Sequence, residues 1–168
     1  MLKRIGLGLV ALGLLAALVR FLLVTLASDE TKIRWAIQDA ADGFGRARLA
    51  PVLAALAPDF QDETSGFRRE DLRGPLIAVF FQEKDPATKR FPYRLEIADE
   101  ALEIAVTRGE PDSAEVAFQG SIVDTRGGGR RAAWAFRIEG RMEEREEGWV
   151  FVRTTHETRE GSFRLRAR

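Results

Sequence analysis

The chain has 168 residues, with 26 basic and 26 acidic side chains, one histidine and no cysteine. The lack of cysteine excludes a disulfide-stapled domain and a lipoprotein anchored through a cysteine, so the fold must be stabilised by packing. Three of the basic residues lie before residue 28, which leaves 23 basic and 26 acidic side chains and a net charge of −3 in the remainder. This is not the charge balance of a nucleic-acid-binding protein, because such binding requires a strongly basic face.

An apolar segment from Ile5 to Ala27 follows Lys3 and Arg4, and only Arg20 interrupts it. At about 1.5 Å of rise per residue, its 23 residues cross a hydrocarbon core of roughly 30 Å as a helix. Fourteen Leu, Ile, Val and Phe residues each favour insertion by about 0.3 to 0.6 kcal/mol, which outweighs the cost of about 2.5 to 3.5 kcal/mol for Arg20. The segment therefore predicts a transmembrane anchor at residues 5–27.

The charges around this segment predict its orientation. Lys3 and Arg4 precede it and acidic residues follow it, so residues 1–4 are expected to form a cytoplasmic tip. In a bacterium the chain is then a single-pass inner-membrane protein with its domain in the periplasm. A cleaved signal peptide is the alternative, with residues 5–19 as its apolar region and residues 25–27 as the cleavage site. The retained anchor is favoured because the apolar run exceeds the usual length of such a region.

Helical patterns come first after the anchor. Residues 31–44 carry Ile33, Ile37 and other apolar residues at intervals of three and four, and Ser28 or Asp29 is placed to cap this helix. A second short helix is expected around Pro51, which suits a first turn, and Pro58 ends it. A third is expected at about residues 69–82.

Trp35 lies on the charged face of the first of these helices and is expected to be exposed. Because it follows the apolar segment by only eight residues, it is placed to join the interfacial aromatic belt of a membrane. Filling a gap under the sheet or contacting a partner is the open alternative.

Beyond Pro92 the apolar residues alternate with polar ones, and Gly-rich turns separate the alternating runs. These runs predict consecutive hairpins. The fold class is therefore α+β, with three N-terminal helices covering one face of a curved, meandering antiparallel sheet. Residues 28–160 form this domain, and residues 161–168 form a basic tail or a last edge strand.

Four features together resemble the nuclear transport factor 2-like superfamily, especially its SnoaL-like branch. They are the order of the helices, the Ala-Pro-Asp-Phe segment at residues 57–60, the helix ending in Phe80-Phe81 and the Glu-Gly-Trp hairpin at residues 147–149. The resemblance implies a cystatin-like cone whose sheet wraps around a long helix and leaves a pocket at one end. In some members of the superfamily that pocket holds an enzyme site, and in others it only binds ligands or partners. Many members dimerise through the sheet.

The candidate catalytic residues are His156, Asp124 and Tyr93. The resemblance implies them, because isomerases and dehydratases of this superfamily use these residue types. Structural roles for all three are the favoured alternative. Either Trp149, Phe151 and Arg153 or Val150, Val152 and His156 point inward, and the aromatic set slightly favours an outward His156. The residues expected to line the pocket are Val116, Phe118, Ile122, Trp134, Phe136 and Ile138.

The other sequence features predict no cofactor. Gly127 to Gly129 lie between two expected strands, so they indicate a hairpin tip and not a phosphate-binding loop. One histidine and no cysteine leave no cluster of metal ligands. We expect the outer face of the sheet to form a homodimer surface, because small residues lie in its middle and opposed charges at one end. Its residues are Ala117, Gln119, Ser121, Val123, Ala133, Ala135, Arg137, Glu139 and Arg141.

Two functions follow from these observations. The favoured one is a membrane-anchored extracytoplasmic domain without catalytic activity that binds a small apolar ligand or an envelope protein partner. The alternative is an enzyme of the SnoaL or ketosteroid isomerase kind, which moves a proton on an apolar small molecule. The second requires His156, Asp124 and Tyr93 to lie within hydrogen-bond reach of one another in one cavity.

Overall fold

The computed structural model of the protein describes residues 27–163. The expected anchor at residues 5–27 lies outside this range except for its last residue. Within the described range, no helix combines the length and hydropathy needed to cross a membrane.

Residues 27–163 contain three helices, and the second is shorter than expected. Helix α2 begins after Ser28, whose hydroxyl accepts a hydrogen bond from the Thr31 amide as a helix cap. Its buried face carries Ile33, Ile37 and Phe44 at the predicted spacing. The second helix, which was expected to be short and to end at Pro58, spans only six residues and ends at Ala54, so two of the three helices are long. The bounds are α2 (Asp29–Gly45), α3 (Leu49–Ala54) and α4 (Arg69–Gln82).

One six-stranded sheet forms the other half of the domain. The strand order is β1-β6-β5-β4-β2. Strand β2 pairs with residues 120–124 of β4, and β3 pairs with residues 113–117 of β4. Two short 3₁₀ turns connect strands that follow each other in the chain: η1 (Asp99–Ala101) joins β2 to β3, and η2 (Arg126–Gly128) joins β4 to β5. The strands are β1 (Leu56–Asp62), β2 (Tyr93–Ile97), β3 (Glu103–Thr107), β4 (Ser113–Asp124), β5 (Arg131–Arg145) and β6 (Gly148–Gly161).

The prediction of an antiparallel sheet that follows all the helices is wrong because of strand β1. It lies between α3 and α4 in the chain and pairs with β6 in parallel, so the sheet is mixed. Pro58 suggests a break in the sequence, because proline donates no hydrogen bond to a neighbouring strand. It is tolerated here since β1 is the edge strand of the sheet, and the pairing is irregular between Leu56 and Gln61.

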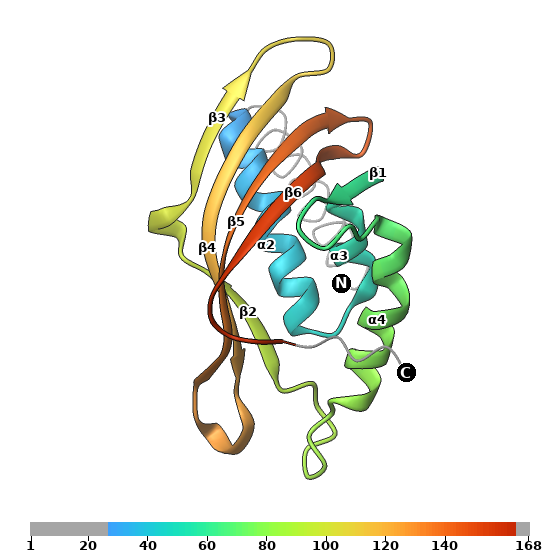
Figure 1. Ribbon diagram of the computed structural model, residues 1–168, viewed down its shortest axis with the longest axis vertical. Coiled ribbons are helices and arrows are strands. Elements are labelled where there is room, and N and C mark those ends of the chain that lie inside the picture. The colour runs from blue at the N-terminus through green and yellow to red at the C-terminus, as the bar shows by residue number, and fades with distance from the viewer. Residues whose placement is uncertain (1–26, 164–168) are drawn as a thin grey trace, which may run out of the picture.

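The core lies between the concave face of the sheet and the helices. The sheet curves around α2, and α3 and α4 lie beyond that helix (Figure 1). Aromatic rings fill one end of the core: the Phe91 ring meets those of Phe44, Phe80 and Tyr93 edge-on, at centroid distances of 5.1 to 5.5 Å. Trp35 on the outer side of α2 is 43% exposed, as its position on the helix predicted.

A bulge in β6 decides which way His156 faces. Phe151 pairs with Met142, whereas Arg153 pairs with Arg141, so Val152 is the extra residue on β6. The extra residue shifts the alternation by one position. Both Phe151 and His156 therefore lie on the inner face, and the expectation of an outward His156 is wrong.

Candidate functional site

His156 lies beside Asp62 on the inner face of the sheet. Its Nδ1 atom is 3.1 Å from one oxygen of the Asp62 carboxylate and 3.4 Å from the other. The two residues are 94 positions apart in the chain, and the parallel pairing of β1 with β6 brings them together. A carboxylate accepts hydrogen bonds only, so the contact places the imidazole proton on Nδ1 when the ring is neutral.

Asp62 is buried and held in place by further donors. Only 8% of the residue is exposed. Its carboxylate accepts hydrogen bonds from the amide and the hydroxyl of Ser65, and from the Thr154 hydroxyl at 3.3 Å. Thr64 joins the same turn to β6, since its hydroxyl accepts from the His156 amide at 2.8 Å. The carboxylate is therefore fixed in position before any ligand binds.

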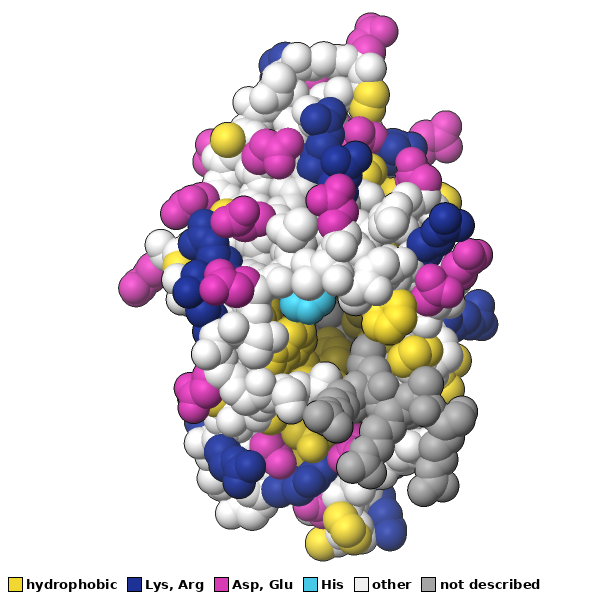
Figure 2. Space-filling view, in the orientation of Figure 1, with side chains coloured by type: hydrophobic (Ala, Val, Ile, Leu, Met, Phe, Trp, Pro, Cys, Tyr) yellow, Lys and Arg dark blue, Asp and Glu magenta, His cyan; other side chains and the backbone are white. Residues whose placement is uncertain are grey.

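The ring of His156 borders an apolar hollow. The Trp134 ring meets it edge-on at a centroid distance of 5.8 Å, and Ile138 is its partner on β5. Trp134 also packs against Phe136 at 4.4 Å, and its indole N–H donates to the Thr158 hydroxyl. Figure 2 shows the hollow with hydrophobic walls below the chain's one histidine, drawn in cyan.

This arrangement suits proton transfer. Asp62 holds Nδ1, which leaves Nε2 as the basic atom of the ring, and within residues 27–163 no hydrogen bond to Nε2 is formed. A histidine oriented by a carboxylate is the usual form of a general base or acid. The apolar walls next to it favour an uncharged, largely apolar ligand.

The structure does not bring the three predicted catalytic residues together. Tyr93 and Asp124 are direct partners across β2 and β4, but His156 makes no hydrogen bond or ion pair with either of them. Arg126 joins the first two instead: its guanidinium donates to the Tyr93 hydroxyl at 3.0 Å and lies 3.6 Å from the Asp124 carboxylate. Glu83 completes this cluster, 3.1 Å from Arg126.

The cluster constrains the phenol of Tyr93. Burial raises the pKa of this phenol, and the positive charge of Arg126 offsets the rise only in part. The hydroxyl donates toward Glu83 over 3.4 Å, and the guanidinium of Arg126 lies over the ring. Tyr93 is thus a neutral, buried side chain that fastens β2 to the end of α4 and to the turn after β4.

The residues expected to line the pocket share the inner face of the sheet but differ in burial. Trp134 and Ile138 are half-buried and lie next to His156. The other four belong to the packed core and are 5% exposed or less, namely Val116, Phe118, Ile122 and Phe136.

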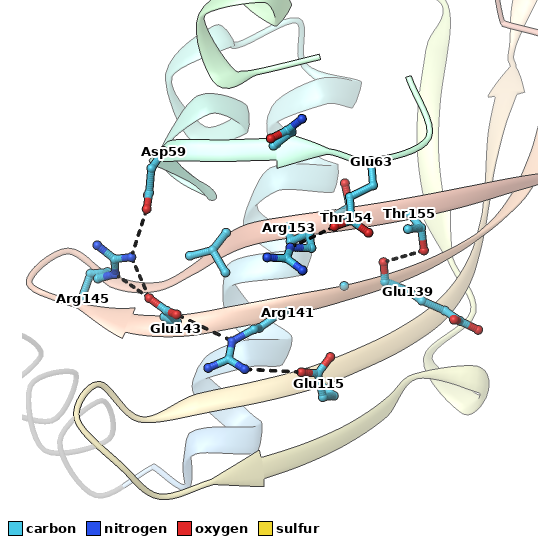
Figure 3. A pocket seen from close by; sticks show the side chains of 13 residues that line it. Asp59, Glu63, Glu115, Glu139, Arg141, Glu143, Arg145, Arg153, Thr154 and Thr155 are labelled. Carbon is cyan, nitrogen blue, oxygen red and sulfur yellow. Dashed lines mark hydrogen bonds and ion pairs between the residues drawn. The ribbon is translucent and has the colours of Figure 1, made fainter. Parts of the chain in front are cut away.

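A separate depression on the outer sheet face is filled by paired charges. Figure 3 shows Arg141 between Glu115 and Glu143, and Arg145 between Glu143 and Asp59. Acidic residues outnumber the arginines in the lining of this depression, and Arg141 and Arg145 are already paired across β1, β4 and β5. The hollow beside His156 is the better candidate site, because it places an oriented imidazole next to apolar walls.

Asp62 and its supporting residues were not predicted from the sequence. The one local signal is Asp62 followed by Ser65 and Gly66, a pattern typical of a turn in which the aspartate accepts hydrogen bonds from the backbone. That signal indicates a turn, and nothing near it in the sequence points to His156.

No protein-family model matches the chain, and no curated protein matches its sequence. Solved structures share its fold. An NTF2-like protein with a cystatin-like fold from Novosphingobium aromaticivorans is 15% identical, with 88% of this chain and 90% of that chain covered and a TM-score of 0.59. A proposed scytalone dehydratase from the same organism is 14% identical, with coverage of 82% and 89% and a TM-score of 0.58.

A ketosteroid isomerase-like protein from Erwinia carotovora atroseptica is 18% identical, with 77% of this chain and 95% of that chain covered and a TM-score of 0.50. The domain therefore has the NTF2-like, cystatin-like α+β fold that the sequence resemblance implied. At these identities the likeness establishes the fold alone.

Proposed function

We propose that the domain binds a small, uncharged and largely apolar molecule in the hollow and that His156 transfers a proton to or from it. The observation that carries this proposal is the contact of Asp62 with His156 Nδ1 at 3.1 Å, next to the apolar wall formed by Trp134. The enzyme alternative in its predicted form fails, because His156 does not meet Asp124 or Tyr93. The proton-transfer proposal rests instead on Asp62, a partner that the sequence did not predict.

The roles within the pair are distinct. His156 is the group that touches the substrate, through Nε2, and takes a proton from a carbon or oxygen atom. Asp62 is a positioning residue, because it holds the ring and stabilises the imidazolium that forms when the proton arrives. The hydrogen bonds from Ser65 and Thr154 keep the carboxylate from turning away.

A general probe tests the proposal without knowledge of the substrate. The flat, neutral 5-nitrobenzisoxazole opens its ring when a base removes its one ring C–H proton beside the nitrogen. We expect the full-length chain in detergent micelles to accelerate this reaction, and His156→Gln to lower the rate by about 100-fold or more. Arg159→Gln serves as the control, because Arg159 is exposed on the same strand and pairs with the exposed Glu157.

A second variant separates positioning from proton transfer. Asp62→Asn should lower the rate and also change the tautomer of His156, since an amide accepts or donates at Nδ1 with equal ease. The chain has one histidine, so its two ring nitrogens are read directly by long-range ¹H–¹⁵N NMR. A wild-type rate equal to that of His156→Gln would remove the catalytic part of the proposal and leave ligand binding.

Ligand binding without catalysis is the second candidate, and the hollow's apolar walls favour it on their own (Figure 2). Native mass spectrometry of the full-length chain would report a bound molecule and the subunit number together. We further propose that the domain works outside the cytoplasm beside envelope proteins, as a single-pass membrane protein, and that it forms a homodimer through the outer sheet face.

A further inference from the structure

A second concave surface lies at the other end of α2 from Asp29. It is formed by the end of that helix, by residues 84–94 and by the turn at residues 125–128, and it encloses about 860 Å³. In Figure 1 the two loops hang side by side at the lower end of the domain. We call this surface the basic cleft, because six of its lining residues are cationic: Arg46, Lys84, Lys89, Arg90, Arg94 and Arg126.

Acidic side chains do not balance these charges. Asp85 is the only acidic residue in the lining. Its carboxylate already accepts the amides of Ala87 and Thr88 at 2.9 and 2.7 Å, and the Thr88 amide is the main reason that the pKa of Asp85 is lowered. Asp85 therefore shapes its own turn and does not reach the cations as an ion-pair partner.

The six cations differ in what already neutralises them. Arg126 pairs with Glu83 and Asp124, and Arg46 pairs with Asp42. Within residues 27–163 the other four form no ion pair, although Lys84 lies over the Phe81 ring at 4.9 Å. Unpaired like charges gathered around one concavity repel one another and attract an anion into it. The unpaired cations are Lys84, Lys89, Arg90 and Arg94.

We propose that the basic cleft binds a soluble small molecule that carries phosphate or several carboxylates. Arginine side chains recognise these groups through paired hydrogen bonds, and lysine adds charge. A lipid headgroup offers the same chemistry, but position favours the soluble source. The cleft lies at the Gly45 end of α2, whereas the chain before residue 28 joins the other end, roughly 25 Å away at 1.5 Å per residue.

Inorganic pyrophosphate is the probe for this proposal. It is titrated by calorimetry into the full-length chain in a zwitterionic detergent. We expect saturable binding, and Arg90→Gln combined with Arg94→Gln should raise the dissociation constant at least about tenfold, since hydrogen bonds to charged groups are lost. The matched control is Arg69→Gln combined with Arg73→Gln on α4, which removes the same charge outside the cleft and should bind as the wild type does.

Three results would overturn the proposal. The first is no saturable binding, and the second is an equal loss in both double variants, which would indicate a general charge effect. The third concerns the source: binding only to nanodiscs that contain phosphatidylglycerol, with no response to pyrophosphate, would assign the cleft to lipid headgroups. The cleft and the hollow are tested independently, because the Arg90 and Arg94 variants should retain the wild-type rate with the proton-transfer probe.

Discussion

Asp62 illustrates how one buried carboxylate acts on both structure and chemistry. It closes the turn after β1 through Ser65 and reaches β6 through Thr154 and His156. Hydrogen bonds from several donors replace part of the carboxylate's lost contact with water and so offset part of the cost of burying it. Asp62 therefore ties β1, its turn and β6 together at the place where the proposed chemistry needs a fixed imidazole.

The buried environment of Tyr93 can be tested through the pH dependence of stability. Its ordinary pKa is about 10, and burial raises the pKa of the folded chain's phenol above that value. From about pH 10 upward the unfolded chain loses this proton while the folded chain keeps it, so stability falls as the pH rises toward the folded pKa. We expect wild type to lose stability more steeply in this window than Tyr93→Phe does, as measured by urea unfolding.

The same experiment has an internal check. Tyr93 is the only tyrosine in the chain, so phenolate absorbance reports its ionisation directly. At pH 7, Tyr93→Phe should cost about 1 kcal/mol, because the hydrogen bonds with Arg126 and Glu83 are lost. A phenol that ionises at or below pH 10 in the folded chain would contradict the buried environment described above.

At the scale of the elements, the bulge in β6 matters most for the proposed site. It lies beside Gly140 of β5, where an added Cβ would be 2.8 Å from the Arg153 carbonyl oxygen and 3.2 Å from the Phe151 ring. We expect Gly140→Ala to destabilise the fold by about 1 to 3 kcal/mol, because the crowded backbone must shift. The shift should also loosen the contact of His156 with Asp62, which NMR of the histidine ring would show.

Gly129→Ala is the control for this substitution. An added Cβ there has the Arg126 carbonyl oxygen as its nearest neighbour, at 3.8 Å, and Gly129 has an ordinary extended backbone. Its effect on the free energy of unfolding should stay within about 0.5 kcal/mol. Equal effects of the two substitutions would mean that the bulge tolerates a side chain and does not fix the position of His156.

Periodicity in the sequence predicted some elements well and others poorly. The third helix was expected at residues 69–82 and α4 spans Arg69–Gln82, since a long repeat of three and four residues has few other interpretations. Strand β1 was missed because Pro58 reads as a break, and only the edge position of β1 permits it. The bulge in β6 was missed because it depends on how two strands fit, which alternation within one strand does not reveal.

The candidate site was predicted only in part for a related reason. His156 was identified because it is the chain's one histidine, but its partner lies 94 residues away. The pairing of β1 with β6 creates that contact, and a missed strand hides it. Tyr93 and Asp124 were named as candidates beside His156, but the structure pairs them with each other, and Arg126 and Glu83 tie them into a cluster apart from His156.

For the whole molecule, the two faces of the sheet differ in character. The inner face carries the apolar core and the Asp62–His156 pair, whereas the outer face carries a lattice of ion pairs around Arg141 and Arg145 (Figure 3). Exposed ion pairs add little stability individually. Mixed charges of this kind keep a surface soluble, and small residues such as Ala117 and Ser121 lie between them on the face where we propose that a second copy binds.

The predicted anchor determines which compartment both proposed sites face. We expect the full-length chain, expressed in a bacterium with a C-terminal tag, to sediment with membranes, and we expect added protease to remove the tag from spheroplasts but not from intact cells. The reason is the apolar run at residues 5–27 with Lys3 and Arg4 on its cytoplasmic side. A variant without residues 2–27 should stay soluble and protected inside the spheroplasts.

Two other outcomes of this experiment have defined meanings. A soluble periplasmic chain whose mass corresponds to a start at Ser28 would identify residues 1–27 as a cleaved signal peptide, and the domain would still lie outside the cytoplasm. A tag that resists protease in intact spheroplasts and becomes sensitive only after lysis would place the domain in the cytosol. The basic cleft and the hollow would then meet cytosolic metabolites, and the proposed location would be wrong.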